Sequence, residues 1–457
     1  MKKAPWYRKY FEGKKVTVMG LGLLGRGVGD TAFLADQGAR LIVTDLKDEH
    51  ELAKSVKKLE KYENIEFVLG RHRHGDFKRR DIILKSAGVP LKNEYLDTAK
   101  ESDTEITMSA AWMVSIAKQE GIDVTTIGVT GTKGKSTVTG MIESVLKESG
   151  VRYHLAGNVR GKANLPLLKQ IRSGDIVLME LDSWQLQGFE AAGISPNISV
   201  FTNFFPDHMN YYKGSMKKYF SDKAAIFRNQ KDSDITIISS GTKDAIEKYG
   251  RKSDQSKHFK VIGGKETTNI KLSVPGEHNK LNAAMASAVF GHLGYRKTTI
   301  KSGLQNFKPV EGRLQDLGLH KGVRFINDNN STTPESTLLT LKAVKELNPK
   351  GRIVWFGGGS DKLCDYKELG KEIPSMCDYA LLLSGKGTEK IIKTVPKSFQ
   401  SAIAQVDHMK QAFKALEGLT KRGDVVVFSP AAASFGLFEN EYDRNDQFMR
   451  ELTRFKQ

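Results

Sequence analysis

The strongest constraint on the fold is a glycine-rich stretch near residue 130. An apolar run over 124–129 precedes it, a helical apolar pattern over 137–145 follows it, and residues 128–136 read GVTGTKGKS. A strand, a glycine-rich turn and a helix in that order form a phosphate-binding loop, whose backbone N–H groups face an anion at the helix N-terminus. The sequence therefore predicts an ATP site in an α/β domain with a parallel sheet.

We expect the loop residues to divide the work of binding ATP. Lys135 should reach the outer phosphates, and the Ser136 hydroxyl should ligate Mg²⁺. The strict motif has glycine where Val129 stands, so this loop is a variant. The residues expected to contact ATP are Gly131, Thr132, Lys133, Gly134, Lys135, Ser136 and Thr137.

A second glycine pattern lies near the N-terminus. Gly20, Gly22 and Gly25 form G-x-G-x-x-G after an apolar strand, and Asp45 ends the next strand. This pattern favours a nucleotide or a diphosphate at the turn, without identifying a nicotinamide cofactor. A doubly wound domain with no ligand at its turn remains an alternative.

Polar residues also follow other apolar strands, where parallel sheets place their ligands. Glu180 ends one such strand and is a candidate Mg²⁺ partner, and His208 follows another. Lys223 lies in an amphipathic helical segment and, taken alone, reads as a solvent-exposed lysine. Asn279 and Asn282 share one helix face and suit the edge of a purine.

The last third of the chain restarts the α/β alternation. Its apolar strands again run into polar or glycine-rich loops, which is the ligand-binding edge of a parallel sheet. The reactive-looking residues on these loops are Asp328, Lys362, Ser434 and Arg444.

Composition excludes several classes of protein. The formal net charge is +18, but the lysines are scattered and form no basic stripe, so we expect no nucleic-acid polymer as a partner. No apolar run is long enough to cross a membrane, and the two cysteines have no metal-ligand or redox spacing. A chain of 457 residues suggests two to four domains. We expect a cytoplasmic protein.

Taken together, these motifs resemble those of the Mur ligase family over nearly the whole chain. The short N-terminal domain with GLGLLG and KSAGVP is most similar to the glutamate-adding branch. The motifs that carry the resemblance are GVTGTKGKST (128–137), ME-x-x-S-x-Q (179–185), N-x-x-x-DH (203–208), Lys223 in its helix, GEHN-x-x-N (276–282), EGR (311–313), IND (326–328), GGxxDK (358–362) and SPAAAS (429–434).

The resemblance implies three domains. They are a Rossmann-like domain for the UDP substrate (1–107), a central ATPase with a mostly parallel sheet (108–308) and a Rossmann-like domain for the amino acid (309–457). It also implies the reaction, which is ATP-dependent addition of D-glutamate to UDP-N-acetylmuramoyl-L-alanine through an acyl phosphate, for peptidoglycan precursor synthesis. UDP then takes the place of a dinucleotide at the first glycine turn, and we expect a monomer.

The resemblance also assigns residues to roles. It implies catalysis by Lys135, Glu180, His208 and Lys223. It implies two Mg²⁺ ions on Ser136, Glu180, His208 and Lys223, the last as a carbamate. It implies that Asn279, Asn282, Arg313 and Asp328 contact the adenine, phosphates and ribose of ATP. It implies that the UDP substrate is bound by Gly22, Leu23, Leu24, Asp45, Ser86, Gly88, Asn158 and Gln185. It implies that glutamate is bound by Thr332, Lys362 and Ser434.

Two departures from the family pattern leave an alternative amino acid open. D-glutamate-adding members usually carry a lysine where Asn330 stands and an aromatic residue where Glu441 stands. The run around Asn330 is similar to that of a subgroup that adds L-glutamate, so L-glutamate is the alternative to D-glutamate. An NAD-dependent oxidoreductase built on Gly20–Gly25 is a further alternative, but it leaves the phosphate loop without a purpose.

Overall fold

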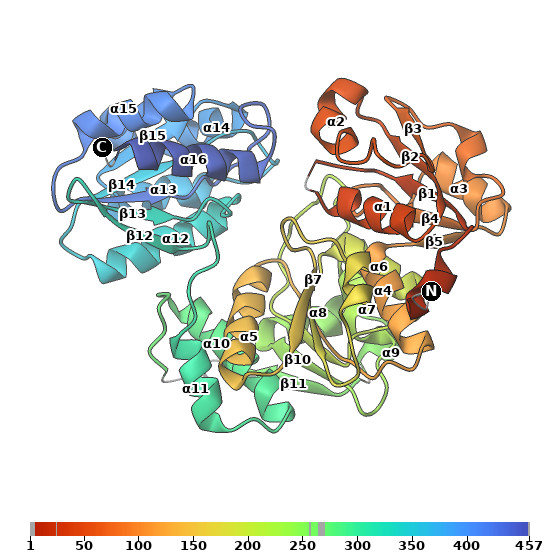
Figure 1. Ribbon diagram of the computed structural model, residues 1–457. Helices are drawn as coiled ribbons and strands as arrows, with labels where there is room; N and C mark the ends of the chain where they lie inside the picture. The colour runs from red at the N-terminus through yellow and green to blue at the C-terminus, as the bar shows by residue number, and fades with distance from the viewer. Residues whose placement is uncertain (1–4, 24, 256, 264–269, 456–457) are drawn as a thin grey trace. The chain divides into compact units, whose positions relative to one another are not determined.

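The computed structural model describes residues 5–23, 25–255, 257–263 and 270–455. The chain is an α/β protein with three sheets, as the sequence predicts (Figure 1). It forms two compact units, Met1–Thr268 with Leu281–Gly303, and Asn269–Lys280 with Leu304–Gln457. The first unit contains two sheets and the second contains one. None of the described helices is both long and apolar enough to cross a membrane.

The first sheet has five parallel strands. In spatial order they are β3 (Ile65–Leu69), β2 (Arg40–Asp45), β1 (Lys15–Met19), β4 (Ile82–Lys85) and β5 (Glu105–Thr107). The direction of winding reverses between β1 and β4, and ligands of open α/β sheets bind at such a reversal. β4 is buried along its whole length, which explains the apolar run Ile82–Leu84 but not Lys85, the charged residue that ends the strand. The helices of this domain are α1 (Arg26–Asp36), α2 (Glu49–Val56) and α3 (Glu94–Glu101).

The second sheet has six parallel strands and carries the phosphate loop. In spatial order they are β11 (Phe259–Ile262), β10 (Ile235–Ser239), β9 (Ile198–Phe201), β6 (Thr125–Thr130), β8 (Ile176–Glu180) and β7 (Tyr153–Gly157). Val129 of β6 pairs with Glu180, and Thr130 pairs with Phe201. The carboxyl ends of β8, β6 and β9 therefore lie side by side around the loop.

Helices alternate with the strands of the second sheet. The chain enters it through α4, which spans Ser109–Gln119. The others are α5 (Lys135–Ser149), α6 (Ser183–Ala191), α7 (Met216–Arg228), α8 (Ser240–Tyr249), α9 (Lys252–Gln255), α10 (Glu277–His292) and α11 (Lys297–Gln305).

The third sheet has six strands, and only its first strand is antiparallel. In spatial order they are β12 (Gln315–His320), β13 (Val323–Asn327), β17 (Val425–Phe428), β14 (Ile353–Gly358), β15 (Tyr379–Leu383) and β16 (Ile403–Val406). Its helices are α12 (Pro334–Leu347), α13 (Lys367–Met376), α14 (Lys386–Thr394), α15 (Met409–Leu419) and α16 (Glu441–Phe455). The loops that follow β13, β17 and β14 meet at one sheet edge because these strands are neighbours.

The first two sheets are held together by apolar and polar contacts within one unit. The rings of Phe11 and Trp112 meet edge to face with their centroids 5.0 Å apart. The buried carboxylate of Asp30 accepts hydrogen bonds from the backbone N–H groups of Asn164 (2.9 Å) and Leu165 (2.8 Å). A buried acceptor held by two donors ties α1 to the loop after β7. The exact domain boundaries, at residues 107 and 308, stay predictions from the sequence.

Candidate active site

Two glycines of the phosphate loop occupy positions that other residues would strain. Gly134 has φ +80° and caps α5, and Gly131 has φ +146°. A Cβ on Gly131 would lie 1.9 Å from the Thr202 hydroxyl oxygen, so a side chain does not fit there. These glycines let the backbone turn directly into the N-terminus of α5, where an anion is favoured.

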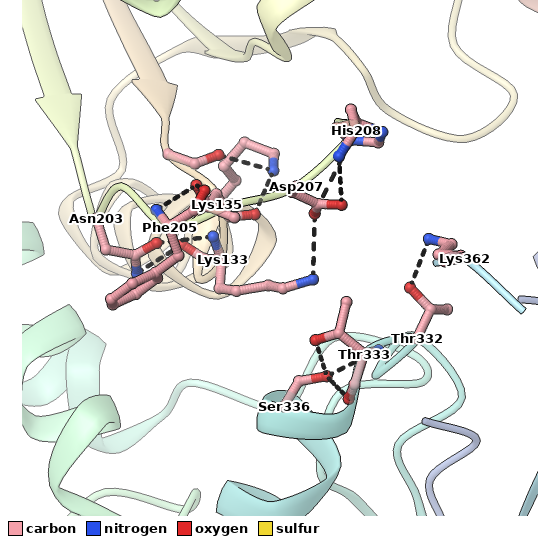
Figure 2. Close-up of polar contacts among 12 residues, drawn as sticks. Lys133, Lys135, Asn203, Phe205, Asp207, His208, Thr332, Thr333, Ser336 and Lys362 are labelled. Atoms are coloured by element: carbon pink, nitrogen blue, oxygen red, sulfur yellow. Dashed lines mark hydrogen bonds and ion pairs between the residues drawn. The ribbon is translucent and has the colours of Figure 1, made fainter. Parts of the chain in front are cut away.

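The two lysines of the loop have different partners (Figure 2). Lys135 donates from Nζ to the carbonyl oxygens of Gly131 (3.1 Å) and Thr132 (3.2 Å). The Nζ of Lys133 lies 3.4 Å from Oδ2 of Asp207, and its backbone N–H donates to Oδ1 of Asn203 (2.8 Å). The loop after β9 is thereby fastened to the phosphate loop.

Lys223 lies beneath the phosphate loop, on the inner face of α7. It is 1% exposed, and its Nζ donates to the Gly131 carbonyl oxygen (2.8 Å). Burial, and then the charge of Lys135, hold the pKa of Lys223 well below its usual value. The interpretation of Lys223 as a solvent-exposed lysine is therefore wrong, because α7 turns this position toward the sheet. The resemblance had already pointed to the nucleotide site.

Glu180 ends one of the two strands that flank β6, and His208 lies in the loop after the other. Glu180 is 8% exposed and ends β8. His208 has φ +55°, an uncommon conformation for a residue other than glycine. Its backbone N–H donates to Oδ1 of Asp207 (2.9 Å), and its ring packs on Trp184 with centroids 4.7 Å apart. The strained turn and the ring contact hold the imidazole in place.

The two asparagines of α10 differ in their surroundings. Asn282 lies against the phosphate loop, because a Cβ on Gly134 would be 3.0 Å from its Oδ1. Asn279 belongs to the second unit and donates from Nδ2 to the Pro275 carbonyl oxygen (2.7 Å). The structure thus brings Asn282 to the loop, while contact of Asn279 with adenine stays a prediction.

A cavity of about 260 Å³ opens at the reversal between β1 and β4. Predicted substrate residues line it, namely Gly22, Leu23, Ser86, Gly88 and Gln185. Asp45 lies under the glycine turn and accepts from the N–H groups of Gly22 (3.2 Å) and Lys47 (3.0 Å). Asn158 accepts from Arg26, which also lines the cavity. Leu24 lies outside the described residues.

Several residues that line this cavity were not predicted from the sequence. They are Arg26, Asp30, Lys85, Met108, Ser109 and Asn164. Lys85 carried a usable signal, since a lysine that ends an apolar strand just before the Ser86 loop lies at the binding edge of the sheet.

Residues predicted to bind the amino acid lie on neighbouring loops of the third sheet. Lys362, after β14, donates from Nζ to the Thr332 hydroxyl oxygen after β13 (3.0 Å, Figure 2). Ser434 lies in the loop after β17 and is 4% exposed. One cation and two hydroxyl groups at one sheet edge suit a carboxylate ligand.

The buried groups nearby shape these loops. Asp328 is 3% exposed and accepts from the Leu314 N–H (3.1 Å) and from the hydroxyl groups of Thr340 (2.5 Å) and Ser429 (3.1 Å). Burial raises the pKa of Asp328, and the nearby Arg313 opposes this shift. A carboxylate with three protein donors holds the loop, and its contact with ribose stays a prediction.

Arg444 was predicted to lie on a loop, but it lies in helix α16 and is fully buried against the loops that follow β13 and β17. Its guanidinium donates to Oδ1 (2.8 Å) and the carbonyl oxygen (2.8 Å) of Asn329, and to the carbonyl oxygen of Ala432 (3.1 Å). Asn330, the departure noted in the sequence, donates from Nδ2 to the Glu311 carbonyl oxygen (3.1 Å).

Comparison with known proteins identifies the family. The chain matches the Mur ligase MurD-like N-terminal domain over residues 14–108, the Mur ligase middle domain over 129–259 and the Mur ligase glutamate ligase domain over 312–432. A UDP-N-acetylmuramoylalanine–D-glutamate ligase of Borreliella afzelii is 34% identical, and the match covers 95% of this chain and 96% of that protein. The chain belongs to the Mur ligase family.

Other Mur ligases are also similar to this chain, in sequence or in fold, over nearly its whole length. The protein of the same name from Roseiflexus sp. is 32% identical, with 97% of this chain and 99% of that protein covered. The fold matches the crystal structure of the UDP-N-acetylmuramate–alanine ligase MurC of Thermotoga maritima, with a TM-score of 0.63, 19% identity and coverage of 96% and 99%. It also matches the MurF ligase of Thermotoga maritima in complex with ADP, with a TM-score of 0.61, 17% identity and coverage of 98% and 96%.

Proposed function

We propose that this Mur ligase joins D-glutamate to UDP-N-acetylmuramoyl-L-alanine with hydrolysis of ATP to ADP and phosphate, in the cytoplasmic synthesis of peptidoglycan precursors. The observation that carries the proposal is the phosphate loop over a buried Lys223, in a chain whose relatives of 32–34% identity are named as ligases of this kind. We further propose that it acts as a monomer, which light scattering of the purified protein tests.

ATP is held by the loop in this proposal. The N–H groups at the start of α5 would receive its phosphates, and Lys135 would turn from its own carbonyl partners to the γ-phosphoryl group. Asn282, which touches the loop at Gly134, is placed to contact the nucleotide. Phosphoryl transfer requires mainly positioning and neutralisation of charge, which this arrangement supplies.

The residues present fit Mg²⁺ when nucleotide is bound. Among the described residues, no three His, Cys, Asp or Glu side chains gather to hold a metal ion by themselves. Mg²⁺ in ATP-dependent enzymes takes one or two protein oxygens and completes its shell with phosphates and water. Ser136, Glu180 and His208, with Lys223 as a carbamate, would hold up to two ions. Mg²⁺ supplies charge neutralisation on the phosphates.

The environment of Lys223 supports its carbamylation. Only a neutral amine attacks CO₂, forming an N–C bond and losing a proton, and burial favours the neutral amine here. The carbamate would replace a cation by two hard oxygens. This modification is part of the proposal.

The reaction would proceed in two steps. The alanyl carboxylate of the UDP substrate attacks the γ-phosphorus, and the bond to the β–γ bridging oxygen breaks to give an acyl phosphate and ADP. The amino group of glutamate then attacks the acyl carbon, loses a proton and expels phosphate. Lys362, with Thr332 and Ser434, would hold the carboxylates of glutamate for this step.

The test is a ligase assay with purified protein, UDP-N-acetylmuramoyl-L-alanine, ATP and Mg²⁺. Phosphate release and the mass of the product are measured in parallel with D-glutamate and L-glutamate. The names of the relatives favour D-glutamate, and a higher kcat/KM for L-glutamate would establish the alternative raised by Asn330. Absence of product with either enantiomer would reject the proposal.

A further inference from the structure

Lys85 is a buried lysine for which the reaction above has no role. It is the last residue of β4 and is only 2% exposed. It is one of the residues that line the cavity at the reversal between β1 and β4, beside Ser86 and Gly88. A buried titratable group in the wall of a ligand cavity is a candidate binding residue.

The hydrogen bonds of Lys85 go to neutral groups. Its Nζ donates to the carbonyl oxygens of Ser86 (3.1 Å) and Val89 (2.7 Å). Within the described part of the chain, no acceptor meets its third N–H and no carboxylate lies within ion-pair distance. Burial lowers the pKa of Lys85 to about 8, although the charges of Asp182 and Asp222 oppose that shift. An ammonium buried against neutral carbonyls is unfavourable, so a ligand that neutralises it would be strongly favoured.

The remaining charged groups of the cavity also favour an anion. Arg26 lines the cavity and uses one guanidinium nitrogen on Asn158. Asp30 is the carboxylate in the lining, and its charge is met by the N–H groups of Asn164 and Leu165. Burial raises the pKa of Asp30 to about 6, which further weakens its repulsion of an anion at acidic pH.

We propose that Lys85 binds the diphosphate of the UDP-linked substrate with the N–H that its own loop leaves unused. The inference rests on the proposed function and deepens it, because it names the group that neutralises the substrate's central charge. Charge-assisted hydrogen bonds to phosphate oxygens are among the strongest available to a lysine. The same ammonium holds the turn over 86–89, so ligand and turn are stabilised together.

Binding of uridine and of UDP separates this role from a purely structural one. The variants are Lys85→Met, which keeps the length of the side chain without charge, and Lys85→Gln, which keeps a donor. Isothermal titration calorimetry should show that UDP affinity falls about tenfold to a hundredfold in both variants. The affinity for uridine, which has the same base and no phosphate, should change little. ATP binding at the phosphate loop reports on correct folding.

Two results would overturn the inference while leaving the proposed function intact. One is equal loss of uridine and UDP affinity, as expected if Lys85 only holds its turn. The other is unchanged UDP affinity in both variants. If the wild-type protein binds ATP but no UDP, the proposed function fails together with the inference.

The wild-type protein provides a second measurement if the variants do not fold. Between pH 7 and pH 9, loss of the Lys85 proton should lower the ratio of UDP to uridine affinity several-fold, given its pKa of about 8. The carboxylates of Asp182, at the N-terminus of α6, and of Asp222, on α7, oppose the lowering of the Lys85 pKa by burial, and Arg26 and Asp30 of α1 line the same cavity. Asp30, whose pKa is about 6, stays ionised over most of the range from pH 7 to pH 9. Titration of the uracil base affects uridine and UDP alike, so it cancels in the ratio of their affinities. A constant ratio would refute the role of Lys85.

Discussion

Replacement of Lys223 by alanine tests the chemistry proposed for the phosphate loop. The change removes a side chain that is 1% exposed and leaves the carbonyl oxygen of Gly131 without its donor at 2.8 Å. Loss of buried packing and of this hydrogen bond should together lower the free energy of unfolding by about 2–4 kcal/mol. Domains of ordinary stability survive such a loss, so the variant should fold.

Turnover should fall much more than stability. Residues that merely support a metal ligand change activity by about 10–100-fold, so loss of the carbamate itself should cost at least about 100-fold. Formate or acetate should restore part of the activity in a saturable way, because a small carboxylate can enter the space left by the side chain and supply the missing oxygens.

The assay follows phosphate release by Lys223→Ala with increasing formate, acetate or chloride. Lys217→Ala, an exposed position on the same helix, is the matched control and should keep wild-type activity without any effect of carboxylates. Undiminished turnover of Lys223→Ala, or equal rescue by chloride, would refute the carbamate.

Three further predictions concern other parts of the molecule. Gly134→Ala should weaken ATP binding about tenfold, because alanine at φ +80° costs roughly 1–2 kcal/mol and its Cβ would press on Asn282. The dissociation constant of ATP, measured by calorimetry, tests this prediction. Lys362→Ala should raise the KM for glutamate about tenfold to a hundredfold and leave that for ATP unchanged, whereas a proportional rise in both would contradict a role in binding glutamate. Between pH 8 and 10.5, Lys85 binds fewer protons in the folded state than in the unfolded state, because its folded pKa is about 8. The free energy of unfolding of the wild type, relative to that of Lys85→Met, should therefore rise by up to about 1.4 kcal/mol per pH unit in urea denaturation. A difference that stays constant with pH would contradict the burial of this charge.

The fold was largely readable from the sequence where its signals are local. The apolar runs of β1, β6 and β8 and the helical pattern of α5 appear in the structure close to where they were predicted. The strands that were missed are five edge strands, β3, β5, β11, β12 and β16, and the internal strand β10, which pairs with the edge strand β11. Partial burial at an edge weakens the apolar pattern on which strand prediction depends.

The phosphate loop was determined by sequence alone, because its geometry depends on residues adjacent in the chain. Glycine at 131 and 134 permits the turn, and Lys135 and Ser136 follow at the start of the helix. The position of Lys223 was different. Its helical segment predicts an amphipathic helix equally well with the lysine in solvent, and only the resemblance to a family suggested otherwise.

Tertiary structure decided which residues share a site. Lys223 is 92 residues from Gly131, and only the packing of α7 against the second sheet brings their atoms to 2.8 Å. The environment of Lys85 also depends on distant segments, since the charges of Asp182 and Asp222 act on its buried ammonium. The sequence alone determined local turns and periodic elements, because adjacent residues specify backbone geometry. The environment of a charge depends on segments far apart in the chain, and only the folded structure defines it.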